Sequence, residues 1–433
     1  MLKPTKTASH NFTKRSDCGD FQVYTHKQNA LTLIYYPIKD TGVITSNITY
    51  KVGSVDERRG ESGLAHMLEH MLFKPTKQDI KKGITSGSIM KFERESGATL
   101  NANTAYDRTT YYLAYPKKYL SHVLGLEAER MQGVTLDDKQ FLPERGNVLS
   151  EFDMYNGDPY FALEVAMRAA TFQSHAYDHE VIGFREDIED YTTDKLQIFY
   201  DMYYQPNNAT LMLIGDLSLE EALTQAEKKF GAKKNKVADI HRETAREPAI
   251  TGPRTVTITR PGTTNILGLG FVYPAFPKHD WYTTYLAIKV LTDGPESIFH
   301  KKFVDTGLVS SIDSILFPTA HSNVGMIFAR LADSIDHDKI KTLMLKERET
   351  IDHQQVTQLL KKEQIKVLTD KAFSRSTSLG VAAELTEYAA CDALDEYANL
   401  QKNIERVTPT QVCEAIQTLL EPNTLTTGYY RSV

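Results

Sequence analysis

Cysteine is scarce in this sequence. The 433 residues include three cysteines, Cys18, Cys391 and Cys413, and no two of them have C-x-x-C spacing. A small and odd number of cysteines without that spacing excludes a disulfide framework and a thiolate metal site as organising features. The low cysteine content favours a reducing compartment, so the sequence predicts a cytoplasmic protein.

Long apolar segments are also absent. Nowhere do about 18 apolar residues follow one another, as a membrane-spanning helix requires. The N-terminal stretch MLKPTKTASHNFTKRSDCGD has no apolar core of the kind that an export signal has. We therefore expect no membrane partner, and a periplasmic location only if the sequence is that of an already processed form.

Positive charge is not in excess. Lys and Arg number 50 and Asp and Glu number 56, which gives a net charge of -6 at pH 7. A surface for nucleic acid or for anionic lipid usually needs an excess of basic residues. The composition thus predicts no nucleic-acid partner and mildly favours basic partners.

The sequence contains a repeat with a period of about 220 residues. The stretches TTDKLQIFYDMYYQPNNATLMLIGD, from Thr192, and TPTQVCEAIQTLLEPNTLTTGYY, from Thr408, both read as a Thr-capped amphipathic helix, a Pro-Asn stop and a β-rich strand. A second pair, from Leu33 and from Val256, reads as two strands around a turn with a helix after them. The repeat predicts two domains of one fold.

The predicted fold class is α+β, with each domain a mostly antiparallel sheet and helices packed on one face. Between the halves, residues 231–253 are polar and charged and end in Gly-Pro, which is typical of a linker. The basic run of this linker reads either as a docking patch or as a solvated tether, and the tether is favoured. The expected domains are 1–230 and 254–433, joined by the linker 231–253.

The stretch HMLEH places titratable groups on an apolar helix. His66 and His70 are four residues apart and so project from one helix face, with Glu69 beside them. Two neutral imidazoles are good zinc ligands, and a nearby carboxylate can take a proton from an activated water, in the inverse order of the H-E-x-x-H motif. The alternative is a His-rich helix end with each imidazole hydrogen-bonded. The apolar flanks favour the cation, because it satisfies buried polar groups.

Two downstream glutamates are candidates for the third ligand that a catalytic zinc usually takes. The stretch FLPERGNVLSEFDMYNGD carries Glu144 and Glu151 seven residues apart, hence close to one face of a helix that begins near Pro143. Either carboxylate could reach the metal, and the alternative is a pair on a solvated surface. The spacing leaves the choice between the two glutamates open.

GLAHMLEHMLF and the later ERGNVLSE together resemble the pitrilysin-type inverzincins, the zinc metallopeptidase family of insulin-degrading enzyme and mitochondrial processing peptidase. The resemblance implies Zn2+ as cofactor, with His66, His70 and Glu151 as its ligands. It further implies that Glu69 is the catalytic base and Glu144 a supporting carboxylate. The implied protein is a half-length catalytic subunit of bacterial type that hydrolyses short or unfolded peptides inside a closed chamber.

The resemblance covers most of residues 30–216 and includes the stretch GATLNANTAYDRTTYYLAY. This stretch is similar to the edge strand of the family, which implies that Asn101, Ala102 and Asn103 bind substrate. In physical terms TLNANTA is a weakly apolar strand whose backbone can pair with an extended peptide beside the metal. The alternative is a strand with a structural role only.

The second half of the chain lacks the metal motif. At the repeat spacing, Ile288, Leu291 and Thr292 occupy the positions of the H-x-x-E-H residues. This half therefore has the fold of the first half without its metal ligands.

The second half also departs from the family pattern in a segment that carries an arginine and a tyrosine facing the zinc. The matching positions here hold Phe303 and Ser310, and no tyrosine occurs between Tyr285 and Tyr388. The neighbouring Lys301 or Lys302 could replace the arginine as a point charge only.

The departure predicts the zinc-bearing subunit of a heterodimer whose homologous partner supplies the arginine and the tyrosine. Two alternatives stay open: a self-sufficient homodimeric peptidase, and a non-catalytic scaffold subunit of the same fold. The intact H-x-x-E-H motif argues against the scaffold.

Overall fold

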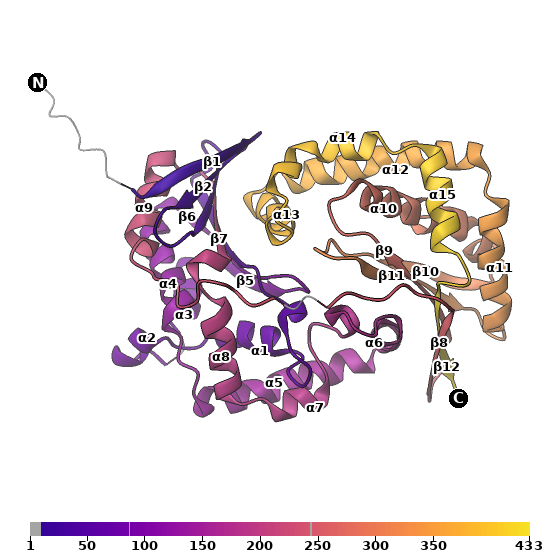
Figure 1. Ribbon diagram of the computed structural model, residues 1–433, viewed down its shortest axis with the longest axis horizontal. Helices are drawn as coiled ribbons and strands as arrows, with labels where there is room; N and C mark the ends of the chain where they lie inside the picture. Colours follow the sequence, from indigo (N-terminus) through magenta and orange to yellow (C-terminus); the bar gives the residue numbers. More distant parts are fainter. Residues whose placement is uncertain (1–9, 86, 243–244) are drawn as a thin grey trace, which may run out of the picture. The chain divides into compact units, whose positions relative to one another are not determined.

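The computed structural model describes residues 10–85, 87–242 and 245–433, which form two compact units (Figure 1). Unit 1 takes its described residues from 1–149, 181–243 and 374–398, and unit 2 takes them from 150–180, 244–373 and 399–433. No helix in these described ranges is both long and apolar enough to cross a membrane.

Unit 1 contains a seven-stranded sheet in which β3 and β7 run parallel and the other neighbours run antiparallel. Its order is β1 (Phe12–Cys18), β2 (Phe21–His26), β3 (Thr32–Pro37), β7 (Ala209–Gly215), β4 (Val43–Tyr50), β6 (Thr109–Pro116) and β5 (Thr99–Thr104). Strand β5, which carries the TLNANT stretch, lies at the edge of the sheet.

Unit 2 contains a five-stranded sheet in the order β10 (Val309–Ile315), β11 (Asn323–Leu331), β9 (Ile266–Tyr273), β12 (Thr426–Ser432) and β8 (Arg254–Arg260). Strands β8 and β12 run parallel and the other neighbours run antiparallel. Read from β8, this order repeats the unit 1 order β3-β7-β4-β6-β5 strand for strand. The prediction of an α+β fold repeated in two halves is confirmed.

Helices cover both sheets. Those of unit 1 are α1 (Leu64–Met71), α2 (Lys77–Lys81), α3 (Ser88–Ser96), α4 (Leu120–Gly133), α7 (Arg185–Asp190), α8 (Thr193–Tyr203), α9 (Leu219–Phe230) and α13 (Ser378–Ala390). Those of unit 2 are α6 (Pro159–Thr171), α10 (His279–Thr292), α11 (His337–Thr350), α12 (His353–Ser374), α14 (Leu400–Glu405) and α15 (Pro409–Leu419). The boundary between the units at residues 149 and 150 falls inside α5 (Asp138–Gly157).

Each sheet has helices on both faces, which corrects the expectation of one covered face. In unit 1, seven of the eight residues of β4 are buried. The amide of Asn47 donates to Thr386 on α13 at 3.1 Å, and the hydroxyls of Thr45 and Ser378 lie 2.7 Å apart. Tyr50, from the other face of β4, packs its ring against that of Tyr204, which follows α8, with the ring centroids 4.2 Å apart. A helix from late in the sequence thus completes unit 1.

The reciprocal arrangement occurs in unit 2, where α6, the purple helix labelled in Figure 1, packs on β8, β9, β11 and β12. Glycines in the sheet allow this helix to approach the strands closely. A Cβ added to Gly268 or to Gly428 would lie 2.4 Å from the sulfur of Met167. Because α6 and α13 each join the unit formed mainly by the other half of the sequence, the units differ from the contiguous domains 1–230 and 254–433.

The described parts of the linker 231–253 form hydrogen bonds with the rest of the protein. On unit 1, Val237 donates its N–H to Gln205 at 2.9 Å, and Arg242 donates to Asp56 at 3.0 Å. Within unit 2, Glu247 accepts the backbone N–H of Gln173 at 2.9 Å. These hydrogen bonds indicate a linker that is held against the protein surface, whereas the sequence favoured a solvated tether.

Asp56, where the linker docks, gives the stability of the chain a pH dependence. Burial raises the pKa of this carboxyl to about 6, although Arg242 and the Gly53 N–H oppose the rise. The folded pKa lies above the unfolded value of about 4, so stability falls as pH rises through this window, by on the order of 1 to 3 kcal/mol. Asp56→Asn should remove this fall, and thermal melts of both chains at pH 4 and pH 7 measure it. An unchanged pH dependence in Asp56→Asn would contradict the assignment.

Candidate metal centre

Helix α1, which carries the HMLEH stretch, is fixed at its N-terminus by a buried carboxylate. Its N-cap is Gly63, which has no side chain to cap the helix and adopts φ 88°. Glu57 supplies the cap instead, accepting the N–H groups of Gly63 and Ala65 at 2.7 Å each. A Cβ at Gly63 would lie 2.4 Å from the carbonyl oxygen of Ile182, so only glycine fits. The start of α1 is therefore held in place.

Five of the eight residues of α1 are buried, and the half-buried ones include His66, Glu69 and His70. The imidazole rings of His66 and His70 have centroids 4.7 Å apart. Burial, and the charge that His70 can carry, lower the pKa of His66 to about 3. His66 is accordingly neutral at physiological pH, which is the state that a metal requires.

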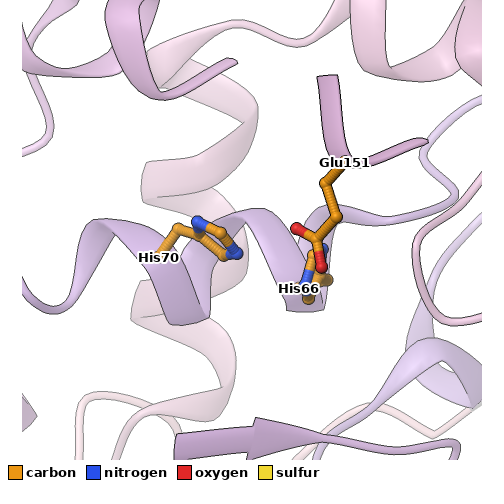
Figure 2. Close-up of side chains that lie close together, drawn as sticks. All are labelled: His66, His70 and Glu151. Atoms are coloured by element: carbon orange, nitrogen blue, oxygen red, sulfur yellow. The ribbon is translucent and has the colours of Figure 1, made fainter. Parts of the chain in front are cut away.

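Glu151 reaches the two histidines from α5. One ligand atom each of His66, His70 and Glu151 lies within 4.8 Å of the others, the one such group among the residues that the structure describes. In Figure 2 the ring of His70 points toward the carboxylate of Glu151, which lies against His66. Two imidazole nitrogens and one carboxylate oxygen form a donor set that suits Zn2+.

Glu144, one of the two glutamates that the spacing left open, contacts a histidine rather than joining this group. Its Oε1 lies 2.8 Å from Nδ1 of His70, and its Oε2 pairs with Lys74 and accepts from Asn147 at 3.2 Å. Burial opposes ionisation, but the bonds from His70 and Lys74 hold the pKa of Glu144 at about 2. A carboxylate here keeps the proton on Nδ1 of His70 and leaves Nε2 for a metal.

Glu69 lies beside the histidines and is held by a strand residue. The hydroxyl of Thr104, the last residue of β5, donates to Oε2 of Glu69 at 2.5 Å. Sequence reasoning gave no role to Thr104 or to Lys74. The signal for Lys74 was its position four residues after His70, and for Thr104 it was its place directly after Asn103 in the TLNANTA stretch.

A groove opens beside these residues within unit 1, and we call it the metal-side groove. It has a volume of about 570 Å³ and is lined by Glu69, His70, Phe73, Lys74, Pro75, Thr85, Met90, Glu93, Leu100, Asn101 and Glu144. The lining comes from α1 and the residues after it, from α3, from β5 and from α5. The size is that of a site for a small ligand or for side chains of a peptide.

The strand residues singled out for substrate binding lie along the edge of the sheet. Asn101, Ala102 and Asn103 pair with β6 on one side only. The N–H of Ala102 donates to the side-chain oxygen of Asn101 at 2.8 Å, and the amide oxygen of Asn103 accepts from Arg108 at 2.7 Å. A peptide that pairs with this edge would take the place of the Asn101 side chain at the Ala102 N–H.

The equivalent region of unit 2 holds structural residues. Ile288, Leu291 and Thr292 are buried on α10, and the hydroxyl of Thr292 donates to the carbonyl of Ile288 at 2.8 Å. Phe303 is buried, and Ser310 donates to the carbonyl of Arg330 at 3.3 Å.

The two lysines that could replace the arginine are engaged in ion pairs within unit 2. Lys301 lies 3.4 Å from Glu296 and from Asp305, and Lys302 pairs with Glu347. Neither lysine is therefore an uncommitted point charge.

Family models match most of the chain. The model described as Insulinase (Peptidase family M16) matches residues 39–184, and the one described as Peptidase M16 inactive domain matches residues 190–368. The first covers the H-x-x-E-H stretch and both glutamates. The second covers most of the segment in which the arginine and tyrosine are missing.

Several bacterial proteins are similar to the chain. The zinc protease PqqE of Helicobacter pylori is 32% identical over 66% of this chain and 64% of that protein. The probable zinc protease PqqL of Escherichia coli is 30% identical over 40% of this chain and 19% of that protein. Both alignments span less than two thirds of these relatives.

Solved structures share the fold. A protease from Helicobacter pylori superposes with a TM-score of 0.87 at 27% identity, covering 95% of this chain and 99% of that one. Pitrilysin superposes with a TM-score of 0.75 at 20% identity, covering 98% of this chain and 46% of that one. At that identity the likeness to pitrilysin is one of fold, and this chain spans about half of the pitrilysin length.

Proposed function

Because this chain belongs to peptidase family M16, the family of insulinase and pitrilysin, and its cofactor is zinc, we propose that it is an endopeptidase whose zinc is held by His66, His70 and Glu151. The observation that carries the proposal is the convergence of their three ligand atoms within 4.8 Å. Three protein ligands leave one coordination position for water or substrate, as catalytic zinc sites do.

The contacts of the side chains around the ligands support this proposal. When bound, zinc polarises the scissile carbonyl and makes water a better nucleophile at neutral pH. Glu69 takes the proton of the attacking water and passes it to the leaving amine. The Thr104 hydroxyl donates to Oε2 of Glu69 and so fixes the position of this carboxylate. Glu144 fixes the ring of His70 through Nδ1.

The proposed substrates are short or unfolded peptides, hydrolysed inside a closed chamber. An extended segment that pairs with β5 would form main-chain hydrogen bonds along Asn101, Ala102 and Asn103 and lie beside the groove. A folded protein has few unpaired extended segments to offer such an edge, so extended or unfolded segments are favoured. The chamber itself rests on the family resemblance.

We further propose that the chain acts with a homologous partner subunit that supplies an arginine and a tyrosine. Their matching positions hold Phe303 and Ser310 here, both with structural contacts, and the lysines beside them are paired. Such a pair would stabilise the oxyanion of the tetrahedral intermediate. Losing one oxyanion donor costs on the order of 100- to 1000-fold in rate.

The partner proposal predicts a rate increase on reconstitution. The purified chain should cleave a quenched peptide weakly, and a co-expressed homologue that carries the arginine and tyrosine should raise the rate by roughly 100- to 1000-fold. A chelator should abolish cleavage and added zinc should restore it. Replacing the arginine and tyrosine of the homologue provides the control.

The same assay separates the alternatives. Full turnover by the chain alone would contradict the heterodimer hypothesis. A dimeric mass in solution would then support a homodimeric peptidase. Stoichiometric zinc without cleavage in any combination would remove the endopeptidase and leave a scaffold subunit of the same fold.

A further inference from the structure

We infer that Glu93 makes the metal-side groove select substrates with a long basic side chain, lysine or arginine. This inference rests on the proposed peptidase function and adds a substrate class to it. The inference is carried by the placement of one half-buried carboxylate among apolar side chains, in a groove whose other charges are already balanced.

The groove is lined by three carboxylates, and two of them bind other side chains of the protein. Glu69 accepts the Thr104 hydroxyl, and Glu144 binds His70 and Lys74. Glu93 is half-buried on α3, and no cation among the residues that the structure describes forms an ion pair with it. Glu93 is thus the carboxylate of the groove that remains to pair with a ligand.

The charge balance of the whole centre isolates the same residue. With zinc bound, the positive charges of the metal and Lys74 equal the negative charges of Glu69, Glu144 and Glu151. The negative charge of Glu93 is not balanced by any of these groups. Inside a partly enclosed groove a single uncompensated carboxylate attracts a cation more strongly than it would on an open surface.

The remaining lining fits the stem of such a side chain. Phe73, Met90 and Leu100 are half-buried and line the same groove. Lysine and arginine place their methylene groups along apolar surface while the charged head reaches a polar partner. A purely apolar residue would use the same walls but would leave Glu93 desolvated and unpaired, and an acidic residue would be repelled.

The test measures peptide binding separately from cleavage. Glu69→Gln chain loaded with zinc is titrated with labelled peptides that are identical except for one position, scanned along the peptide and filled with lysine, arginine, norleucine or glutamate. At one position lysine and arginine should bind roughly tenfold more tightly than norleucine, the neutral analogue of lysine, and glutamate more weakly still. High salt should reduce the preference.

Matched variants assign the preference to Glu93. Glu93→Gln in the same background should abolish it, and Glu93→Lys should reverse it in favour of glutamate. Glu95→Gln should leave it unchanged, because Glu95 is exposed on α3, pairs with Lys91 and does not line the groove. An equal preference for lysine in Glu93→Gln, or tighter binding of norleucine by the parent chain, would overturn the inference.

Cleavage assays with the same peptides separate the inference from the proposed function. If wild-type chain with its partner cleaves all peptides without a basic preference, the inference fails and the peptidase stands. If no peptide is cleaved but the Glu93-dependent binding preference is present, the peptidase fails while the selectivity of the groove is supported.

Discussion

Glu69→Gln chain should bind zinc as the wild type does and cleave a quenched peptide roughly 100 to 10,000 times more slowly. Glutamine has nearly the shape of glutamate and can still accept the Thr104 hydroxyl, so α1 and β5 should keep their positions. It cannot take a proton from the attacking water. Zinc content by mass spectrometry and initial rates on one peptide measure the two effects separately.

A graded control accompanies this substitution. Thr104→Val removes the hydroxyl that holds Glu69 and keeps the carboxylate, so the rate should fall by far less than in Glu69→Gln. Unchanged cleavage by Glu69→Gln would remove Glu69 as the base. Loss of zinc from this variant would instead make Glu69 a ligand.

His70→Ala should lose both zinc and cleavage. The imidazole of His70 is one of the three converging ligands, and its Nδ1 is also the contact through which Glu144 acts on the centre. Two remaining ligands bind a metal weakly, and Glu144 would keep only Lys74 and Asn147 as partners. Added zinc should raise the melting temperature of the wild type and leave that of His70→Ala unchanged, since a ligand stabilises only a fold that binds it.

The matched control for this prediction is His122→Ala. His122 lies on α4 of the same unit and contacts the ring of Phe92, away from the ligand group. This variant should retain full zinc content and the zinc-dependent rise in melting temperature. Stoichiometric zinc in His70→Ala would show that the metal is held elsewhere.

The candidate site could be predicted from sequence to the extent that local spacing determines it. The spacing of four residues from His66 to His70 on an apolar helix predicted two converging imidazoles. Spacing could not choose between Glu144 and Glu151, because they are seven positions apart and both lie near one helix face. Family resemblance favoured Glu151, and the structure places Glu151 beside the histidines and Glu144 on Nδ1 of His70.

Contacts between distant parts of the sequence could not be predicted. Thr104 meets Glu69 across 35 residues, because β5 returns to the end of the sheet beside α1. The polar residues Thr45, Asn47 and Thr49 of β4 face α13, whose Ser378 and Thr386 are polar in turn. A polar interface between helix and sheet has no apolar periodicity by which to recognise it.

The exchange of helices α6 and α13 determines when the chain can finish folding during synthesis. Once the first 230 residues have emerged from the ribosome, every strand of the unit 1 sheet and all of the proposed zinc ligands have been synthesised. One face of β4 still lacks its hydrogen-bonding partners Ser378 and Thr386, which have not yet been synthesised. The nascent unit keeps that polar face open until more than 140 further residues have emerged. The metal ligands are thus among the early parts of the chain to appear, while the helix that covers the opposite side of their sheet is among the last.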